Sequence, residues 1–278
     1  MKQRCIFTLL INSATPYNNN HLNIKSTNNQ QQNTLPLYYD LFKVLNEDRQ
    51  DYATFCDSDY MCYELNDEFI EFERAIKNKC ISFTPYDVIQ YYKIHLCEQL
   101  SKQYKEVLYL DFDVIIGDVK KNFFTEWDLS KGLVIKNEFF DCTKFQYTPG
   151  MSSRYIKAFL AHLVLKYLNI DHDATSLPHI NTGILGCNNQ SISSINFFDI
   201  LYESLKILDD IYLNEKEHWK YVRFSNEIVF TVSWYLNKFK MQSIVDDQNI
   251  WHKKANGVND LNSVFLHCTG KHWLELYT

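Results

Sequence analysis

No stretch of this sequence approaches the roughly 18 consecutive apolar residues that a membrane-spanning helix needs, so the sequence predicts no such helix. It also has no Cys-x-x-Cys pair, which leaves a zinc site without support. Basic residues are fewer than acidic ones, 28 against 34. The resulting net charge of −6 disfavours a general nucleic-acid-binding surface, without excluding a local basic pocket.

The eight cysteines are scattered along 278 residues. Their even number would permit disulfides, but a chain of this length can build a core without them. We therefore expect reduced thiols and a cytoplasmic, intracellular protein. Residues 1–11 contain only a short apolar segment with no clear cleavage site after it, so we expect a first strand there rather than a signal peptide.

The sequence shows neither an internal repeat nor a clear linker, and we expect a single domain over 1–278. Strand-like and helix-like patterns alternate in its first half, which predicts an open α/β sheet. A segment rich in Asn and Gln, 18–33, predicts a mobile loop. The expected strands are 5–11, 52–56, 106–117, 133–135, 180–187, 241–245 and 264–267. The expected helices are 35–45, 67–77, 84–104, 152–168, 194–213 and 225–237.

The longest strongly apolar run, 106–117, contains two carboxylates, Asp111 and Asp113. Apolar residues on both faces predict a central strand that is covered on both sides. Alternate residues of a strand point the same way, so the two carboxylates would converge. Carboxylates in an apolar setting repel each other, and a bound cation is the simplest compensation. Oxygen ligands favour Mg²⁺ or Mn²⁺, and ligands of open α/β sheets bind beyond the carboxyl ends of the strands.

A simpler interpretation is a strand end whose carboxylates face solvent or cap the next helix. A second Asp-x-Asp, 57–59, follows a shorter and less apolar predicted strand, and it ranks lower as a metal site.

Three further patterns carry groups that can bind a ligand. Asn181 and Gly183 interrupt an apolar run, where the amide could contact sugar hydroxyls; the alternative is a turn or bulge. Asn226 and Glu227 stand at a predicted helix start, where simple capping is the alternative. The tail that begins at His267 adds an imidazole, Gly270 and Lys271, which could hold a metal and a phosphate.

Taken in order, these motifs resemble those of metal-dependent GT-A glycosyltransferases. The similar features are Lys-Glu-Val-Leu-Tyr-Leu-Asp-x-Asp, then Asn-Thr-Gly, then His-x-x-Gly-Lys. The most similar type is family 8, which includes glycogenin and the lipopolysaccharide galactosyltransferases. The resemblance implies a Rossmann-like, mixed and mostly parallel sheet flanked by helices. It places nucleotide-sugar binding in about 1–120, and the acceptor side with the terminal metal and phosphate motif in about 121–278.

The resemblance also implies roles for individual residues. The metal, Mn²⁺ or Mg²⁺, would be bound by Asp111, Asp113 and His267. The nucleotide-sugar donor would be contacted by Thr8, Leu9, Asn12, Lys93, Asp111, Phe112, Asp113, Gly183, Gly270 and Lys271. The residues beside the reacting carbon would be Asn181, Asn226 and Glu227.

By the same resemblance the donor is a UDP-sugar, the acceptor is a hydroxyl of a glycan, protein or lipid, and the configuration is retained. An inverting enzyme would instead need a carboxylate base, for which Glu227, Asp246 and Asp247 are candidates. The sequence departs from the family pattern at Asn226-Glu227, where the family has Asp-Gln, and in the tail after Lys271.

Two other functions stay open at this point. A haloacid-dehalogenase-type phosphatase also has an apolar strand that ends in Asp-x-Asp, and 243–247 fits its later acidic motif. Against it, about a hundred residues precede Asp111 and no Thr follows Asp113. The other alternative is a non-catalytic module that binds glycans or nucleotide sugars, which the intact metal motif disfavours.

Overall fold

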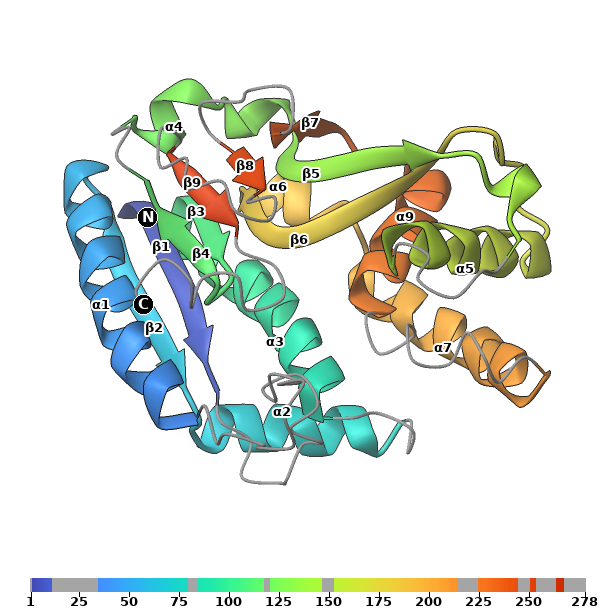
Figure 1. Cartoon of the computed structure of the whole chain (residues 1–278), viewed down its shortest axis with the longest axis horizontal. Coiled ribbons are helices and arrows are strands. Elements are labelled where there is room, and N and C mark those ends of the chain that lie inside the picture. Colours follow the sequence, from blue (N-terminus) through green and yellow to red (C-terminus); the bar gives the residue numbers. More distant parts are fainter. Residues whose placement is uncertain are drawn as a thin grey trace, which may run out of the picture.

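The computed structural model describes residues 2–11, 35–79, 85–117, 121–146, 153–214, 225–244, 251–253 and 264–267. Its largest feature is a six-stranded sheet with the order β2-β1-β3-β6-β5-β7 (Figure 1). The strands are β1 (Lys2–Leu10), β2 (Asp59–Glu64), β3 (Tyr104–Leu110), β5 (Leu133–Phe140), β6 (Leu177–Cys187) and β7 (Met241–Ser243). The Asn- and Gln-rich segment 18–33 lies outside the described residues.

The sheet is mixed and mostly parallel, as expected. Strand β1 runs parallel to β2 and β3, and β7 runs parallel to β5. Only β6 runs against both of its neighbours, β3 and β5. The carboxyl end of β3 therefore lies beside the middle of β6, and the two segments with the strongest motifs become neighbours.

Alternation along the strands divides the core into two layers. Cys5, Phe7 and Tyr109 belong to one buried cluster, whereas Ile6 and Leu108 belong to the other. The first cluster includes residues of the helices α2 (Asp67–Lys77), α3 (Pro85–Leu100), α5 (Ser153–Tyr167), α6 (Asn189–Ser193), α7 (Phe197–Asn214) and α9 (Ser225–Asn237). The second includes residues of α1 (Leu35–Phe55), α4 (Phe123–Glu126) and a small second sheet. Among the described helices, none is both long and apolar enough to cross a bilayer.

The second sheet brings the end of the described chain to the end of β3. It consists of β4 (Val114–Ile116), β9 (Phe265–His267) and β8 (Trp251–Lys253), in that order. Strand β9 pairs antiparallel with β4, so that Val114 and His267 lie opposite each other.

The strand predicted at 52–56 is wrong, because α1 extends to Phe55. Its buried positions include Phe42, Leu45, Arg49, Tyr52 and Ala53. This spacing of three and four residues is that of a continuous helix. The polar run 46–51 hid the pattern, because the one buried residue in that run is an arginine.

The strand predicted at 106–117 is in fact two strands separated by a turn. Strand β3 ends at Leu110, and β4 begins at Val114 in the other sheet. The Val114 amide donates to the Asp111 carbonyl at 3.0 Å, which closes the turn. Asp111 and Asp113 therefore do not project from one extended strand.

Other boundaries differ less. The helix predicted at 67–77 is confirmed in full. The helix predicted to reach residue 104 ends at Leu100, because Tyr104 begins β3. The helix predicted from residue 194 begins at Phe197 and follows the short α6.

Glu98 on α3 provides a test of this packing. Burial raises the pKa of its carboxyl to about 7, with Asp199 raising it further and Lys102 opposing. The folded protein then binds a proton that the unfolded chain has lost between about pH 4.5 and 7, so stability should fall as pH rises through that window. We expect Glu98→Gln to remove about 1–3 kcal/mol of this pH dependence. Urea unfolding at pH 5 and pH 8 measures the free energy of unfolding at each pH. If this free energy changed equally between the two pH values in both proteins, the expectation would be contradicted.

Candidate active site

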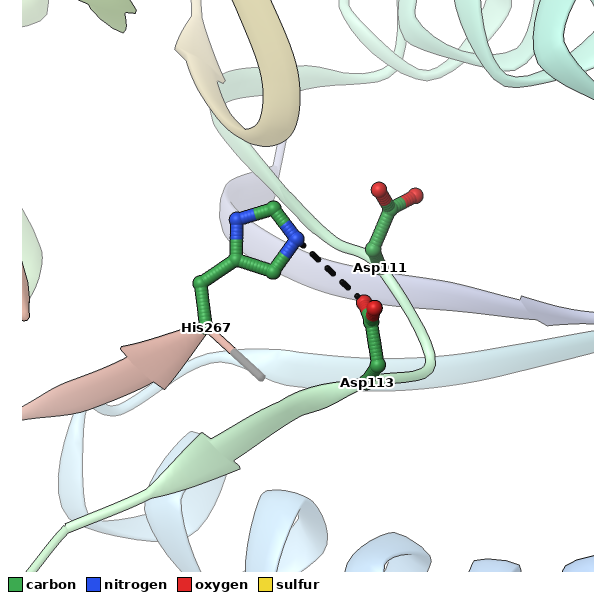
Figure 2. Close-up of side chains that lie close together, drawn as sticks. All are labelled: Asp111, Asp113 and His267. Carbon is green, nitrogen blue, oxygen red and sulfur yellow. Dashed lines mark ion pairs between the residues drawn. The ribbon is translucent and has the colours of Figure 1, made fainter. Parts of the chain in front are cut away.

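Two carboxylates and an imidazole converge where β3 ends (Figure 2). Ligand atoms of Asp111, Asp113 and His267 all lie within 4.8 Å of one another. The Asp113 Oδ1 and His267 Nε2 atoms are 3.3 Å apart. The imidazole is buried, whereas 19% of the Asp111 side chain and 15% of the Asp113 side chain are exposed, so both aspartates are partly accessible.

Asp111 is held by two neighbours from inside the protein. Its Oδ1 accepts a hydrogen bond from the Tyr109 hydroxyl at 2.5 Å and one from the Lys93 ammonium at 3.4 Å. Burial raises the pKa of the Tyr109 hydroxyl well above its ordinary value, and the charge of Asp111 adds to this, so Tyr109 remains a donor. Lys93 extends from α3 with only 1% of its side chain exposed, and its charge offsets part of the acidic cluster.

His267 is positioned by strand β9 and by close contact with β6. Its ring packs against the Cα of Gly183, where any side chain would overlap the imidazole. Burial alone would lower the pKa of His267, but the charge and hydrogen bond of Asp113 raise it overall. Two carboxylates and one imidazole at this separation are a donor set that fits a divalent cation such as Mn²⁺.

The Asn-Thr-Gly motif lies at an irregularity of the sheet, as its structural interpretation predicts. Along β5 the register steps from Ile135 opposite Leu185 to Lys136 opposite Asn181. The intervening residues of β6 therefore bulge. At the bulge, the Gly183 carbonyl accepts from the Asp111 amide at 2.7 Å, and the Gly183 amide donates to the Asn181 side chain at 3.1 Å. The bulge thus joins the acidic turn to Asn181.

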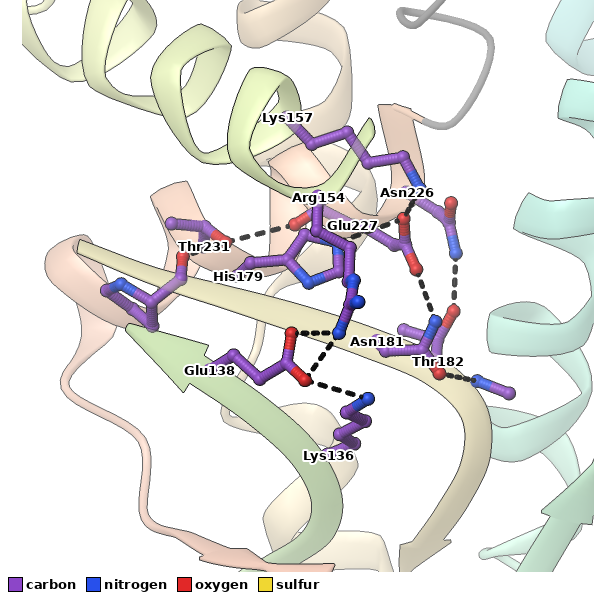
Figure 3. Close-up of polar contacts among 12 residues, drawn as sticks. Lys136, Glu138, Arg154, Lys157, His179, Asn181, Thr182, Asn226, Glu227 and Thr231 are labelled. Carbon is purple, nitrogen blue, oxygen red and sulfur yellow. Dashed lines mark hydrogen bonds and ion pairs between the residues drawn. The ribbon is translucent and has the colours of Figure 1, made fainter. Parts of the chain in front are cut away.

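A buried polar network continues from Asn181 to α5 and α9 (Figure 3). The Asn181 amide donates to Glu227 Oε1 at 2.8 Å. The other oxygen of Glu227 contacts the Lys157 ammonium and lies 3.3 Å from His179 Nε2. Asn226 donates instead to the Thr182 hydroxyl at 2.6 Å.

Glu227 is an ionised carboxylate inside the protein. Burial alone would raise its pKa, but the charge of Lys157 and the hydrogen bonds from Lys157 and His179 lower it well below the ordinary value. Burial lowers the pKa of His179, which favours the neutral ring. Glu227 thus acts in this structure as a partner of buried cationic and amide groups.

The structure brings most of the predicted site residues together around the acidic turn and the bulge. These are Lys93, Asp111, Phe112, Asp113, Asn181, Gly183, Asn226, Glu227 and His267. Thr8 is fully buried, and its hydroxyl donates to the Leu110 carbonyl at 2.8 Å. Leu9 packs in the core. Asn12, Asp246, Asp247, Gly270 and Lys271 lie outside the described residues.

The second Asp-x-Asp lies at the amino ends of the parallel strands, whereas Asp111 and Asp113 follow the carboxyl end of β3. Asp59 begins β2, and its carboxylate accepts hydrogen bonds from Lys2 and Tyr104, each at 2.6 Å. These are the first residues of three neighbouring strands, so Asp59 has a structural partner set far from the end of β3.

Sequence reasoning missed Tyr109, Lys157 and His179. Tyr109 stands within an apolar run of the sequence, and the hydrogen bond of its hydroxyl follows only from the turn that brings Asp111 back towards it. Lys157 left a usable signal, because it interrupts the buried apolar face of a helix. Such a lysine implies a buried acidic partner.

No family model and no curated protein matches this chain. Among solved structures, it is similar to a glycosyltransferase involved in the glycosylation of the major capsid of PBCV-1 (11% identity, 98% of this chain and 96% of that chain, TM-score 0.46). It is also similar to mouse xyloside xylosyltransferase 1 (11%, 96% and 98%, TM-score 0.47). A third is the galactosyltransferase LgtC in complex with donor and acceptor sugar analogs (11%, 96% and 87%, TM-score 0.38).

These neighbours are GT-A glycosyltransferases, the class that the sequence motifs resemble. At such identities and TM-scores the likeness does not define the family of this chain. The residues of the site itself therefore have to indicate the function.

Gly183→Ala tests the position of His267. The added methyl group would overlap the imidazole, so we expect Mn²⁺ affinity, measured by electron paramagnetic resonance, to fall about 10–100-fold. Gly186→Ala is the matched control, because it lies on the same strand and would overlap the Phe123 ring instead. It should lower the melting temperature and spare Mn²⁺ affinity. Equal Mn²⁺ affinities for the two variants would refute this assignment of His267.

Glu227→Gln tests whether this carboxylate is a structural partner. Removing one member of a buried ion pair costs about 3–5 kcal/mol, so the urea midpoint should fall sharply. Adding Lys157→Met removes the opposite charge, and the double variant should recover much of the loss. A midpoint unchanged by Glu227→Gln would show that the buried pair contributes little.

Proposed function

We propose that this protein is a glycosyltransferase that moves a sugar from a nucleotide-sugar donor to a hydroxyl acceptor with a divalent cation. The observation that carries the proposal is the cluster of Asp111, Asp113 and His267 at the carboxyl end of β3. Ligands of open α/β sheets bind at this edge. Lys93 adds a buried ammonium beside the cluster, and the bulge with Asn181 and Gly183 adjoins it.

The charge that develops in sugar transfer explains why such a site is useful. A nucleoside diphosphate gains negative charge as its bond to the sugar breaks. Bound Mn²⁺ or Mg²⁺ would be held by Asp111, Asp113 and His267 and would neutralise part of that charge. Lys93 supplies a fixed positive charge from the protein, and Lys271 is the second phosphate partner that the motif resemblance implies. Interactions that strengthen with the developing charge lower the barrier.

Retention of configuration is the outcome we propose. An inverting reaction needs a carboxylate that can accept a proton from the acceptor hydroxyl. Glu227 is fully engaged by Lys157, His179 and Asn181, and its pKa is lowered, so it is poorly suited to that role. A retaining reaction, as the resemblance to family 8 implies, does not require such a base.

The donor is proposed to be a UDP-sugar, with residues of about 1–120 contacting the nucleotide and about 121–278 forming the acceptor side. Because the Thr8 hydroxyl is engaged inside the protein, any nucleotide contact there would come from the backbone around Leu9 and Asn12. The metal preference is proposed to be Mn²⁺, and the acceptor a hydroxyl of a glycan, protein or lipid.

Asp113→Asn should abolish Mn²⁺-dependent donor binding with little loss of stability. The measurement is the shift in melting temperature with UDP- and GDP-sugars, each with and without Mn²⁺. A ligand at a hundred times its dissociation constant stabilises the folded state by about 2.7 kcal/mol, which such a scan detects. Asp59→Asn, in the second Asp-x-Asp, is the matched control and should keep the shift.

Two results would contradict the proposal. If the melting temperature of Asp113→Asn rose with nucleotide sugar and Mn²⁺ as that of the unmodified protein does, the metal assignment would be wrong. If no nucleotide sugar gave a shift and phosphomonoesters were hydrolysed, the protein would be a phosphatase.

A further inference from the structure

Arg49 is a fully buried arginine that contacts the acidic turn from behind. It extends from α1, and none of its surface is exposed. One terminal nitrogen, Nη2, lies within hydrogen-bond distance of three carbonyls of the turn and shares its two hydrogens among them: Asp111 at 2.9 Å, Phe112 at 2.7 Å and Val114 at 2.8 Å. The other, Nη1, donates to the Thr8 hydroxyl at 3.2 Å.

These contacts fix the direction of the peptide groups in the turn. A carbonyl that accepts from a buried, charged donor cannot rotate away without leaving that donor unpaired. Thr8 extends the same arrangement, because its hydroxyl donates to Leu110 while it accepts from Arg49. The backbone from Leu110 to Val114 is thus held on its inner side, while its two carboxylates meet His267.

The positive charge of Arg49 also favours this arrangement of the turn. Its hydrogen-bond partners named above are all uncharged oxygens, and the carboxylates of Asp111 and Asp113 stand on the same short turn. A fixed cation behind two like charges reduces their repulsion. The Nε of Arg49 is buried without a hydrogen-bond partner among the described residues, so the guanidinium is directed at the turn at some cost in desolvation.

We propose that Arg49 is a positioning residue for the cation and diphosphate site: it holds the turn so that Asp111 and Asp113 point towards one ion. The identity of that ion rests on the proposed function, but the effect on the turn does not. Lysine has a shorter side chain and a single terminal nitrogen, so it cannot place one nitrogen at the turn carbonyls and another at the Thr8 hydroxyl. Arg49→Lys therefore keeps the charge and loses the geometry.

The test compares Arg49→Lys with Arg4→Lys. Arg4 lies on β1, is partly buried and pairs with Glu106 without contacting the turn, so it controls for loss of a structural arginine. Mn²⁺ affinity is measured by electron paramagnetic resonance, without nucleotide or turnover. We expect Arg49→Lys to weaken Mn²⁺ binding about 10–100-fold while its far-ultraviolet circular dichroism spectrum stays unchanged. Arg4→Lys should leave Mn²⁺ binding unchanged.

Amide hydrogen exchange gives a second measurement that needs no metal. In Arg49→Lys the Asp111 and Val114 amides, which are hydrogen-bonded in this structure, should exchange faster than in Arg4→Lys and in the unmodified protein. Unchanged exchange in the turn would overturn the proposal whether or not the protein binds Mn²⁺. Unchanged Mn²⁺ affinity in Arg49→Lys would overturn it too. Failure of the unmodified protein to bind Mn²⁺ would count against the proposed function, while exchange still decides the role of Arg49.

Discussion

The repulsion between Asp111 and Asp113 is the constraint on which the site depends. Their ligand atoms lie within 4.8 Å in a largely buried setting, where like charges are costly. Two groups compensate by direct contact: the Lys93 ammonium contacts one carboxylate, and the His267 ring contacts the other. Each compensating group comes from a different layer of the molecule. The acidic turn therefore holds together α3, the main sheet and the small sheet.

The bulge in β6 is the second element of this arrangement. It connects the acidic turn through Gly183 to Asn181, and through Asn181 to Glu227 on α9. Because Glu227 is in turn paired with Lys157 on α5, the position of Asn181 depends on the helices that cover the far half of the sheet. A site at the end of one strand is thereby supported by residues from most of the chain.

The features that depend on local sequence patterns were predicted correctly. The mixed α/β sheet, the helix at 67–77, the Pro85 helix start and the convergence of Asp111, Asp113 and His267 all followed from periodicity or from motifs. The errors arose where contacts between residues distant in the sequence determine the helix and strand boundaries. A polar run around Arg49 concealed the second half of a helix, because the carbonyls that this arginine contacts lie more than sixty residues away in sequence. The turn after Leu110 was hidden for the same reason, since pairing with β9 breaks the apolar run in two.

The strand β9 has a consequence for the order of events during synthesis. It is the last described strand, yet it delivers His267 and pairs with β4 from the middle of the chain. A nascent chain on the ribosome can form β1, β2 and β3 long before β9 emerges, but its three-ligand cluster stays incomplete. The metal-ligand cluster is therefore still incomplete when most of the large sheet can already have formed. Completion of the small sheet, rather than of the large one, marks the moment at which all three groups meet.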